Sequence, residues 1–301
     1  MGWLRRDEEL MLKKLINYII IGVVCISIIG CSDKNDIKKI DDSKSENTVS
    51  QMEVDYINVG EGDSTLVQFN GKNLLIDSGD DTSVKKVIDY LNGKGIKKID
   101  YLIGSNYYYR NVGGLGDIID NFEIGKVILT KNQDFEADLR KNIESKAKNK
   151  NLSITDIKGG EDPGIELGDV EINILGPIQN IESEYNSLVM KISYGNTAFL
   201  FAGSTDDKIE KKLIKSDIDL KSNVLKVSNG GSDKGTSDKF VKAVSPGTAV
   251  ISVKEGDSKK PGKETIETLK DNNVKVYRTD LDNDIVLKSD GKNVNKVDVN
   301  K

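Results

Sequence analysis

The strongest constraint on the fold is a tight turn at Asn70-Gly71, which lies between two runs of strand-forming residues. Asn-Gly accepts the left-handed backbone of a two-residue hairpin turn, so it is the strongest short signal for paired antiparallel strands. We therefore predict strands over residues 64–69 and 73–77, preceded by a strand over residues 53–59. The folded part of the chain thus begins with a β-meander.

Helix and strand patterns alternate after this meander. Val84, Val87, Ile88 and Leu91 repeat at helical spacing, and Gly93 marks the helix end. Further helices are predicted over residues 114–122, 134–147, 206–215, 237–244 and 263–272. Further strands are predicted over residues 99–104, 126–130, 154–157, 170–175, 186–194, 197–203, 223–228, 248–253, 274–279 and 284–289. Hairpins and strand–helix units occur in both halves, which predicts an α+β or α/β fold: a four-layer αββα sandwich of two mixed β-sheets.

The N-terminus has the pattern of a secretory signal. Lys13 and Lys14 precede an apolar run that ends at Cys31, and Met11 is a better start for such a signal than Met1. The four residues that end at Cys31 resemble a bacterial lipobox, in which the cysteine is lipidated. The alternative is an uncleaved membrane helix, but the uninterrupted apolar part, residues 19–29, is shorter than the ~20 residues that a span needs.

These features predict three segments. Residues 1–30 form a lipoprotein signal peptide, and residues 31–51, which are charged and rich in serine, form a disordered tether. Residues 52–301 form the folded domain. The expected partner of the N-terminus is the membrane, through a lipid anchor on the extracytoplasmic face of the cell membrane.

Two residue types that carry much of enzyme chemistry are nearly absent. The chain has no histidine, and its two cysteines, Cys25 and Cys31, both lie in or next to the predicted signal. Zinc sites of the usual kind and nucleophiles activated by histidine are therefore excluded from the domain. The formal net charge of −5 gives no strong nucleic-acid signal, although local basic clusters remain compatible with an anionic ligand.

The stretch SNYYYRNVGG, residues 105–114, joins a predicted strand to a predicted helix. Loops at such junctions often bind ligands, because the chain end can point several side chains at one molecule. Tyrosines, an arginine and asparagines are unusual equipment for catalysis, which raises the question of what this loop does.

Six colinear segments over residues 52–290 resemble the metallo-β-lactamase fold and, within it, the extracellular domain of DNA-internalisation competence proteins of the ComEC type. The segments are VDYINVGEGDSTLVQFNGKNLLIDSG, GIKKIDYLIGSNYYYRNVGGLGDII, NSLVMKISYGNTAFLFAGS, SNVLKVSNGGSDKGTS, AVISV and NNVKVYRTD. The resemblance implies a fold that usually holds two metal ions, commonly zinc, and hydrolyses phosphoesters or β-lactams.

The resemblance also implies that the metal ligands are replaced. The family's H-x-H-x-D-H places hold Asn106, Tyr108, Arg110 and Asn111. The other three ligand places hold Ala202-Gly203-Ser204, Asn229-Gly230-Gly231-Ser232 and Pro261-Gly262. We therefore expect no bound metal, no catalytic residues and no other cofactor.

The main functional hypothesis is a non-catalytic module that binds a small anionic ligand or a protein partner at the former metal site. The candidate residues are Asp63, Asp77, Asn106, Tyr107, Tyr108, Tyr109, Arg110, Asn111, Ser204 and Asn229. Arg110 supplies either a ligand-binding cation or a partner that neutralises Asp63 or Asp77. Tyr108 either contacts ligand or fills the volume left by the metals.

The alternative hypothesis is a phosphodiesterase or nuclease that holds a hard cation with carboxylates alone. Asp63, Asp77, Asp80 and Asp81 would be its ligands. The simpler interpretation of Asp63 and Asp77 is that they stabilise turns beside glycines. Ser83 and Lys86 also match the S-x-x-K pattern of serine–lysine nucleophiles, but a solvated helix face explains that spacing equally well.

Overall fold

The structure, a computed structural model, describes residues 50–131, 137–179, 181, 183 and 185–298. The predicted signal peptide, Cys31 and nearly all of the predicted tether lie outside these residues. Over the described ranges, no helix has the length and apolar character that crossing a membrane requires.

The first sheet has eight strands. In spatial order they are β14 (Val294–Val297), β13 (Ile285–Ser289), β1 (Met52–Tyr56), β2 (Thr65–Phe69), β3 (Lys72–Ile76), β4 (Lys98–Gly104), β5 (Glu123–Thr130) and β6 (Ile154–Ile157). Pairing is antiparallel from β14 to β3 and parallel from β3 to β6. The predicted turn connects β2 to β3, and both Asn70 (φ +49°) and Gly71 (φ +75°) have the left-handed backbone that this turn needs.

The second sheet has six strands with a similar division. In spatial order they are β12 (Lys275–Arg278), β11 (Thr248–Ile251), β10 (Val224–Lys226), β9 (Thr197–Phe201), β8 (Val189–Tyr194) and β7 (Val170–Gly176). Strands β7 to β9 are antiparallel, whereas β9 to β12 are parallel. Both sheets are therefore mixed, as predicted.

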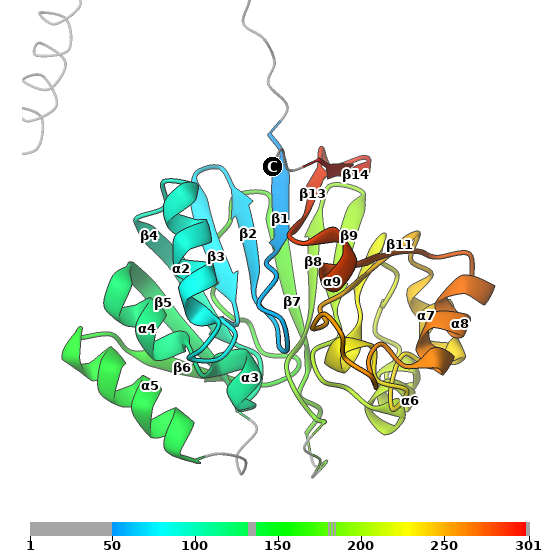
Figure 1. Cartoon of the computed structure of the whole chain (residues 1–301), viewed down its shortest axis with the longest axis horizontal. Coiled ribbons are helices and arrows are strands. Elements are labelled where there is room, and N and C mark those ends of the chain that lie inside the picture. The colour runs from blue at the N-terminus through cyan, green and yellow to red at the C-terminus, as the bar shows by residue number, and fades with distance from the viewer. Residues whose placement is uncertain (1–49, 132–136, 180, 182, 184, 299–301) are drawn as a thin grey trace, which may run out of the picture. The chain divides into compact units, whose positions relative to one another are not determined.

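Helices cover the outer face of each sheet (Figure 1). The first sheet carries α2 (Val84–Gly93), α3 (Tyr109–Val112), α4 (Leu115–Asn121) and α5 (Ala137–Asn149). The second carries α6 (Asp207–Lys215), α7 (Asp238–Val244) and α8 (Lys263–Asp271). A short 3-10 turn, η1 (Ser228–Gly231), follows β10, and α9 (Thr279–Asp282) connects β12 to β13.

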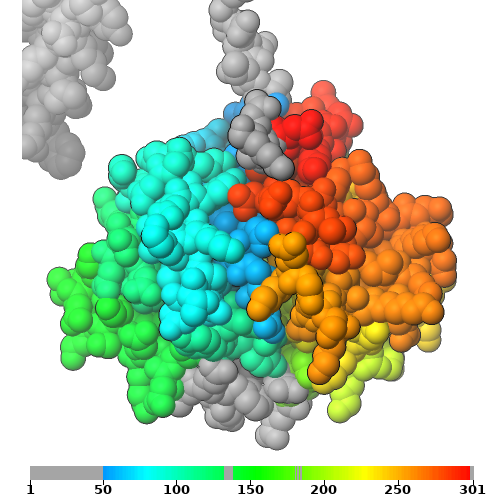
Figure 2. Space-filling model, in the orientation of Figure 1, coloured from blue at the N-terminus to red at the C-terminus, as the bar shows by residue number. Residues whose placement is uncertain are grey.

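Three apolar layers hold these elements together. Tyr56 and Met190 lie in the layer between the two sheets, with Phe199 completing the contact from β9. The other two layers lie between each sheet and its helices. This is the predicted αββα sandwich. The N-terminal half of the domain (blue to green) and the C-terminal half (yellow to red) form its two sides in the space-filling view (Figure 2).

Besides the short turn η1, three elements were not predicted. The loop after β4 contains a short helix, α3, and the chain ends with α9 and the edge strand β14. α3 and α9 have four residues each, which is too few for a helical repeat to show in sequence. β14 has apolar residues only at its two ends, with Asn295 and Lys296 between them, so it lacks the alternation that marks a strand in sequence; it pairs with β13 at the edge of the sheet.

Candidate functional site

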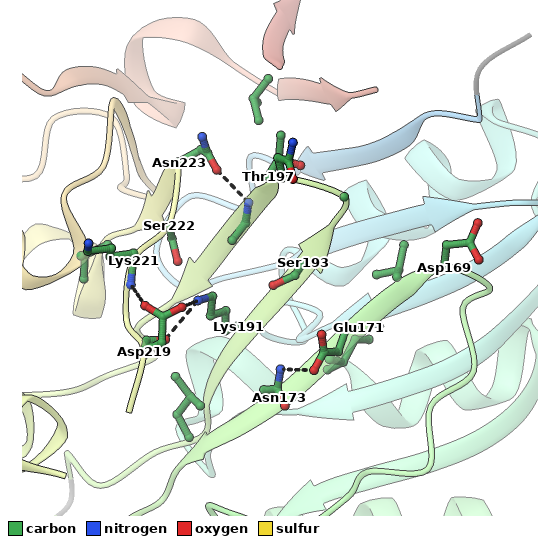
Figure 3. A pocket seen from close by; sticks show the side chains of 18 of the residues that line it. Asp169, Glu171, Asn173, Lys191, Ser193, Thr197, Asp219, Lys221, Ser222 and Asn223 are labelled. Carbon is green, nitrogen blue, oxygen red and sulfur yellow. Dashed lines mark hydrogen bonds and ion pairs between the residues drawn. The ribbon is translucent and has the colours of Figure 1, made fainter. Parts of the chain in front are cut away.

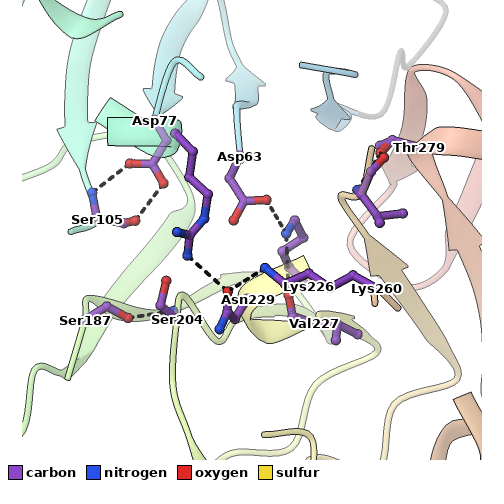
Figure 4. A network of polar contacts seen from close by, with 12 residues as sticks. Asp63, Asp77, Ser105, Ser187, Ser204, Lys226, Val227, Asn229, Lys260 and Thr279 are labelled. Atoms are coloured by element: carbon purple, nitrogen blue, oxygen red, sulfur yellow. Dashed lines mark hydrogen bonds and ion pairs between the residues drawn. The ribbon is translucent and has the colours of Figure 1, made fainter. Parts of the chain in front are cut away.

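The predicted site residues gather where several strands of both sheets end. Asp63 lies in the β1–β2 loop, Asp77 follows β3, and residues 105–112 follow β4. From the second sheet, Ser204 follows β9 and Asn229 follows β10 (Figure 4). Ligands in open α/β folds usually bind at such carboxyl ends of strands.

Asp77 anchors the start of the loop after β4. Its carboxylate accepts hydrogen bonds from the backbone N–H of Ser105 (2.8 Å) and from the Ser105 hydroxyl (2.6 Å). Asp77 is 2% exposed and has a left-handed backbone (φ +59°). Burial raises the pKa of Asp77 to about 7. The contacts of Asp77 agree with the structural role that a turn carboxylate suggests.

Asn106 links the loops of the two sheets. Its Nδ2 donates to the hydroxyls of Ser105 (3.1 Å) and Ser204 (3.3 Å), and its Oδ1 accepts from the backbone N–H of Tyr108 (2.9 Å). The backbone N–H of Ser204 donates in turn to the Ser187 hydroxyl (2.7 Å). At a place where the resemblance implies a metal ligand, Asn106 makes hydrogen bonds inside the protein.

The three tyrosines of the loop point to different surroundings. The Tyr107 hydroxyl donates to the backbone carbonyl of Thr130 (3.1 Å) and accepts from Arg140 (2.7 Å), which fixes the loop to β5 and α5. Tyr109 is 41% exposed, and a hydrogen bond with Asp81 raises its pKa to about 12. Tyr108 is half-buried and presents its ring to a cation of the site.

That cation is Arg110, whose guanidinium carbon lies 4.4 Å from the centre of the Tyr108 ring. Arg110 Nη2 donates to Asn229 Oδ1 at 3.0 Å. Lys260 Nζ donates to the same oxygen at 3.1 Å. Burial lowers the pKa of Lys260, and the positive charge of Arg110 lowers it further. Two cations therefore share one neutral acceptor.

The predicted pairing of Arg110 with Asp63 or Asp77 is not what the structure shows. Within the described part of the chain, Arg110 forms no ion pair. Lys226 of β10 pairs with Asp63 instead, with Nζ 2.5 Å from Oδ1 and side chains only 5% and 15% exposed (Figure 4). Breaking such a pair leaves a poorly solvated charge, so Lys226 and Asp63 must be retained or lost together.

Little space remains at this centre. The residues around it enclose about 10 Å³, which is about the minimum for one water molecule. Ser252 Oγ and Asn111 Oδ1 border this space, and both are buried atoms without a hydrogen-bond partner among the described residues. Most of the place where the resemblance implies a metal site is thus filled by side chains, with one small polar cavity left.

The donor set does not fit the pair of metal ions that the fold implies. Zinc takes thiolate, imidazole and carboxylate ligands. This centre offers amides, hydroxyls, a guanidinium and two ammonium groups, and its two carboxylates, Asp63 and Asp77, are bound to Lys226 and Ser105. Across the described ranges, no three His, Cys, Asp or Glu residues come close enough to hold a metal.

The carboxylates that the alternative hypothesis needs as metal ligands each contact a different partner within the protein. Asp80 accepts hydrogen bonds from the backbone of Thr82 (3.0 Å) and Ser83 (2.8 Å) in its own turn. Asp81 lies next to Tyr109, while Asp63 is paired with Lys226. The Ser83 hydroxyl belongs to the Asp80 turn, so the S-x-x-K spacing reflects a helix start.

A much larger hollow of about 1840 Å³ lies at the other end of the second sheet, where β9, β10 and β11 begin (Figure 3). Its side chains already satisfy one another: Lys191 pairs with Asp219 (2.7 Å), and Asn173 donates to Glu171 (3.0 Å). None of the predicted site residues lines this hollow.

The sequence did not indicate Lys226 as the partner of Asp63, and it did not indicate Lys260 as part of the site. The available signal for Lys260 was its position directly before Pro261-Gly262, the place where the resemblance implies a metal ligand. Nothing in the sequence indicated that this lysine would reach Asn229.

The two-sheet sandwich and this centre define the class of protein. Residues 57–254 match the metallo-beta-lactamase superfamily, and the chain belongs to that superfamily.

Two curated relatives are competence proteins. ComE operon protein 3 of Bacillus subtilis (strain 168) is 25% identical over 252 residues, which are 77% of this chain and 32% of the relative. Competence protein ComA of Neisseria gonorrhoeae is 26% identical over 231 residues, which are 74% of this chain and 30% of the relative. The chain therefore spans about a third of the length of these relatives.

Solved structures share the fold at lower identity. Igni18, described as a novel metallo hydrolase from the archaeon Ignicoccus hospitalis KIN4/I, is 14% identical with a TM-score of 0.54, covering 78% of this chain and 98% of its own. The metallo-beta-lactamase fold protein YhfI from Bacillus subtilis is 13% identical with a TM-score of 0.50, covering 79% of this chain and 100% of its own. At these identities the similarity establishes the fold alone.

Proposed function

We propose that this chain is a non-catalytic recognition module, anchored by a lipid on Cys31 at the extracytoplasmic face of the cell membrane. The observation that carries the proposal is the buried ion pair between Lys226 and Asp63 at the former metal centre. A positive side chain in that place opposes a metal ion, and Arg110 adds a second positive charge nearby.

The chemistry of hydrolysis supports the same conclusion. A bound metal lowers the pKa of water from about 15.7 to about 7, which supplies hydroxide at neutral pH. The amides and hydroxyls of Asn106, Asn111 and Ser204 have no comparable effect. What the centre retains is the capacity to bind, through hydrogen-bonding groups and the fixed cations Arg110 and Lys260 at its outer edge, which we call the mouth.

The location rests on the sequence of the N-terminus. The lipobox-like residues before Cys31, together with a serine-rich segment behind it, are typical of a lipoprotein tethered outside the membrane. Similarity to the competence proteins supports a role connected with the cell surface, but the shared part is about a third of those proteins. DNA uptake is therefore not part of the proposal.

The test is metal content combined with turnover. We expect the purified protein to contain no stoichiometric transition metal by elemental analysis, and its melting curves with and without chelator to coincide. Hydrolysis of a phosphodiester and of a β-lactam should stay at background with added Zn²⁺, Mn²⁺ or Mg²⁺. Stoichiometric metal, or hydrolysis that a chelator abolishes, would favour the carboxylate-bound hydrolase instead.

A further inference from the structure

The strongest unexplained feature of the molecule is the convergence of Arg110 and Lys260 on one amide oxygen. Each donates to Asn229 Oδ1, so their nitrogen atoms are at most about 6 Å apart. Like charges at this distance repel each other, and a neutral amide compensates neither of them. A side chain that serves two cations at once is a weak substitute for an anion.

The carboxylates nearby do not neutralise this pair. Asp63 is already bound to Lys226. Asp257 accepts hydrogen bonds from the backbone N–H groups of Lys259 (2.8 Å) and Lys260 (3.1 Å), and Glu61 is exposed. Both act on Lys260 from a distance, yet burial and Arg110 dominate. The mouth of the centre therefore keeps uncompensated positive charge.

The small cavity behind Asn229 gives a second and independent observation. Ser252 is 3% exposed and Asn111 is 2% exposed; both residues line this space, and each has a buried polar atom without a partner among the described residues. A volume of about 10 Å³ admits one oxygen atom and no more. A ligand would place one oxygen there, with its remaining atoms outside at the mouth.

We propose that this mouth binds the tetrahedral oxyanion of a phosphate or phosphate monoester. Arg110 holds two of its oxygens with the guanidinium fork, and the ammonium of Lys260 contacts one of these two. One oxygen replaces Asn229 Oδ1 as the shared acceptor and points toward Ser252. The inference rests on the proposed function, because it places a bound ligand at a centre without hydrolysis.

A phosphate fits better than the other anions. Its charge of about −1.5 to −2 matches two cations, whereas a carboxylate supplies a single charge. A long polyanion is less suitable, because the chain as a whole has a net charge of −5 and the cavity accepts a single oxygen.

The experiment titrates the full-length protein with inorganic phosphate by calorimetry at low ionic strength. Lys260→Met and Arg110→Gln should each weaken binding at least tenfold, while Lys259→Met, at the exposed neighbouring position, should leave it unchanged. Acetate should bind at least tenfold more weakly than phosphate. Equal losses in Lys259→Met and Lys260→Met, or equal binding of acetate, would overturn the site.

Two further arms distinguish the source of the phosphate. Glycerol phosphate represents a soluble monoester, and phosphatidylcholine vesicles with and without phosphatidic acid represent a lipid headgroup. If Arg110→Gln weakens binding of glycerol phosphate or of the vesicles with phosphatidic acid, the oxyanion site is supported and the source of the phosphate is identified. If Arg110→Gln weakens binding in neither arm, the oxyanion site is overturned. If the protein neither binds phosphate nor hydrolyses the test substrates, the oxyanion site fails but the non-catalytic proposal stands. Hydrolysis that a chelator abolishes contradicts the non-catalytic proposal directly.

Discussion

Two lysines, Lys226 and Lys260, reach the centre from the second sheet and end in different surroundings. Lys226 is buried against a carboxylate, Asp63, while Lys260 shares a neutral oxygen with Arg110. In the first contact each charge neutralises the other in a mostly buried place, so removing either partner alone destabilises the fold. The second leaves positive charge at the mouth. Substitutions should therefore separate stability from binding.

Lys226→Met should lower the free energy of unfolding by about 3 kcal/mol, because it strands the mostly buried carboxylate of Asp63. Urea denaturation of the variant and of the natural protein measures this difference. In the double variant with Asp63→Asn, most of the loss should be recovered, since no unpaired charge remains. A single variant as stable as the natural protein would show that water solvates Asp63 adequately.

Arg110→Ala should change the free energy of unfolding by less than about 1 kcal/mol. Arg110 contacts a neutral amide and the Tyr108 ring, and its removal leaves no buried carboxylate without a partner. The same denaturation series gives the value. A loss as large as 3 kcal/mol would mean that Arg110 seals the centre, which is the role we assign to Lys226.

Asp77→Asn should make the protein less sensitive to pH between about 4 and 7. Because the pKa of Asp77 is raised to about 7, the folded state holds a proton there that the unfolded state has released. Stability therefore falls as pH rises through this window. Asparagine fits the left-handed backbone, and its amide can satisfy the backbone N–H and hydroxyl of Ser105.

The difference in free energy of unfolding between Asp77→Asn and the natural protein should shift by about 2 kcal/mol in favour of the variant from pH 5 to pH 7. Urea denaturation at the two pH values tests this. Glu210, whose pKa burial also raises to about 7, should keep part of the slope in the variant. Parallel pH profiles for both proteins would mean that Asp77 is ionised throughout.

At the scale of elements, the β1–β2 loop and helix α3 are in direct contact. A Cβ added at Gly62 would lie 1.9 Å from the backbone oxygen of Arg110, at a φ of +110°. A Cβ at Gly71, also at positive φ (+75°), would meet nothing within 4 Å. The two glycines thus differ chiefly in what a side chain would strike.

Gly71→Ala should cost about 1 kcal/mol, the strain of the backbone alone. Gly62→Ala should cost at least about 2 kcal/mol more, because the loop or α3 must move. Thermal or urea denaturation of the two variants tests the contact. Equal losses of stability in the two variants would show that α3 or the loop can move aside without an energetic penalty.

Most elements could be predicted because their signals are local. The Asn70-Gly71 turn and the helical spacing from Val84 to Leu91 lie within a few residues, and the structure confirms both. α3, α9 and β14 are too short for a repeat to appear, so their positions depend on neighbours distant in the chain.

The site was predicted less completely for the same physical reason. The fold brought Asn106 into contact with Ser204, and Arg110 into contact with Asn229, across the two sheets. The partner of Asp63, however, lies 163 residues away, and Lys260 approaches Asn229 from 31 residues away. Charge pairing across two sheets is decided by packing, which no local pattern encodes.

At the scale of the whole molecule, the first strand is held on both sides. β1 pairs with β2, which follows it directly, and with β13, from the C-terminal part of the chain. The hairpin β13–β14 belongs to the C-terminal part of the chain, but it joins the first sheet, which is otherwise formed by β1 to β6 (Figure 1). Strand β1 follows immediately after the predicted tether.

Cys31→Ala should move the protein from the membrane fraction to the soluble fraction of cells. Lipidated cysteine would hold the protein at the membrane, since two or more acyl chains anchor stably. Fractionation with immunodetection, together with mass analysis of the mature N-terminus, tests the expectation. A Cys31→Ala protein that keeps the acyl mass and its membrane retention would contradict it.

The double pairing of β1 also has a mechanical consequence. Residue 50 and the centre at Asp63 lie beyond opposite ends of β1, so tension between a tether and a captured ligand runs along this strand. The hydrogen bonds to β2 and β13 are perpendicular to that direction, and they carry the load in shear, all together rather than one after another. The strand that follows the predicted tether is thereby the one best placed to resist being pulled out while the ligand end is held.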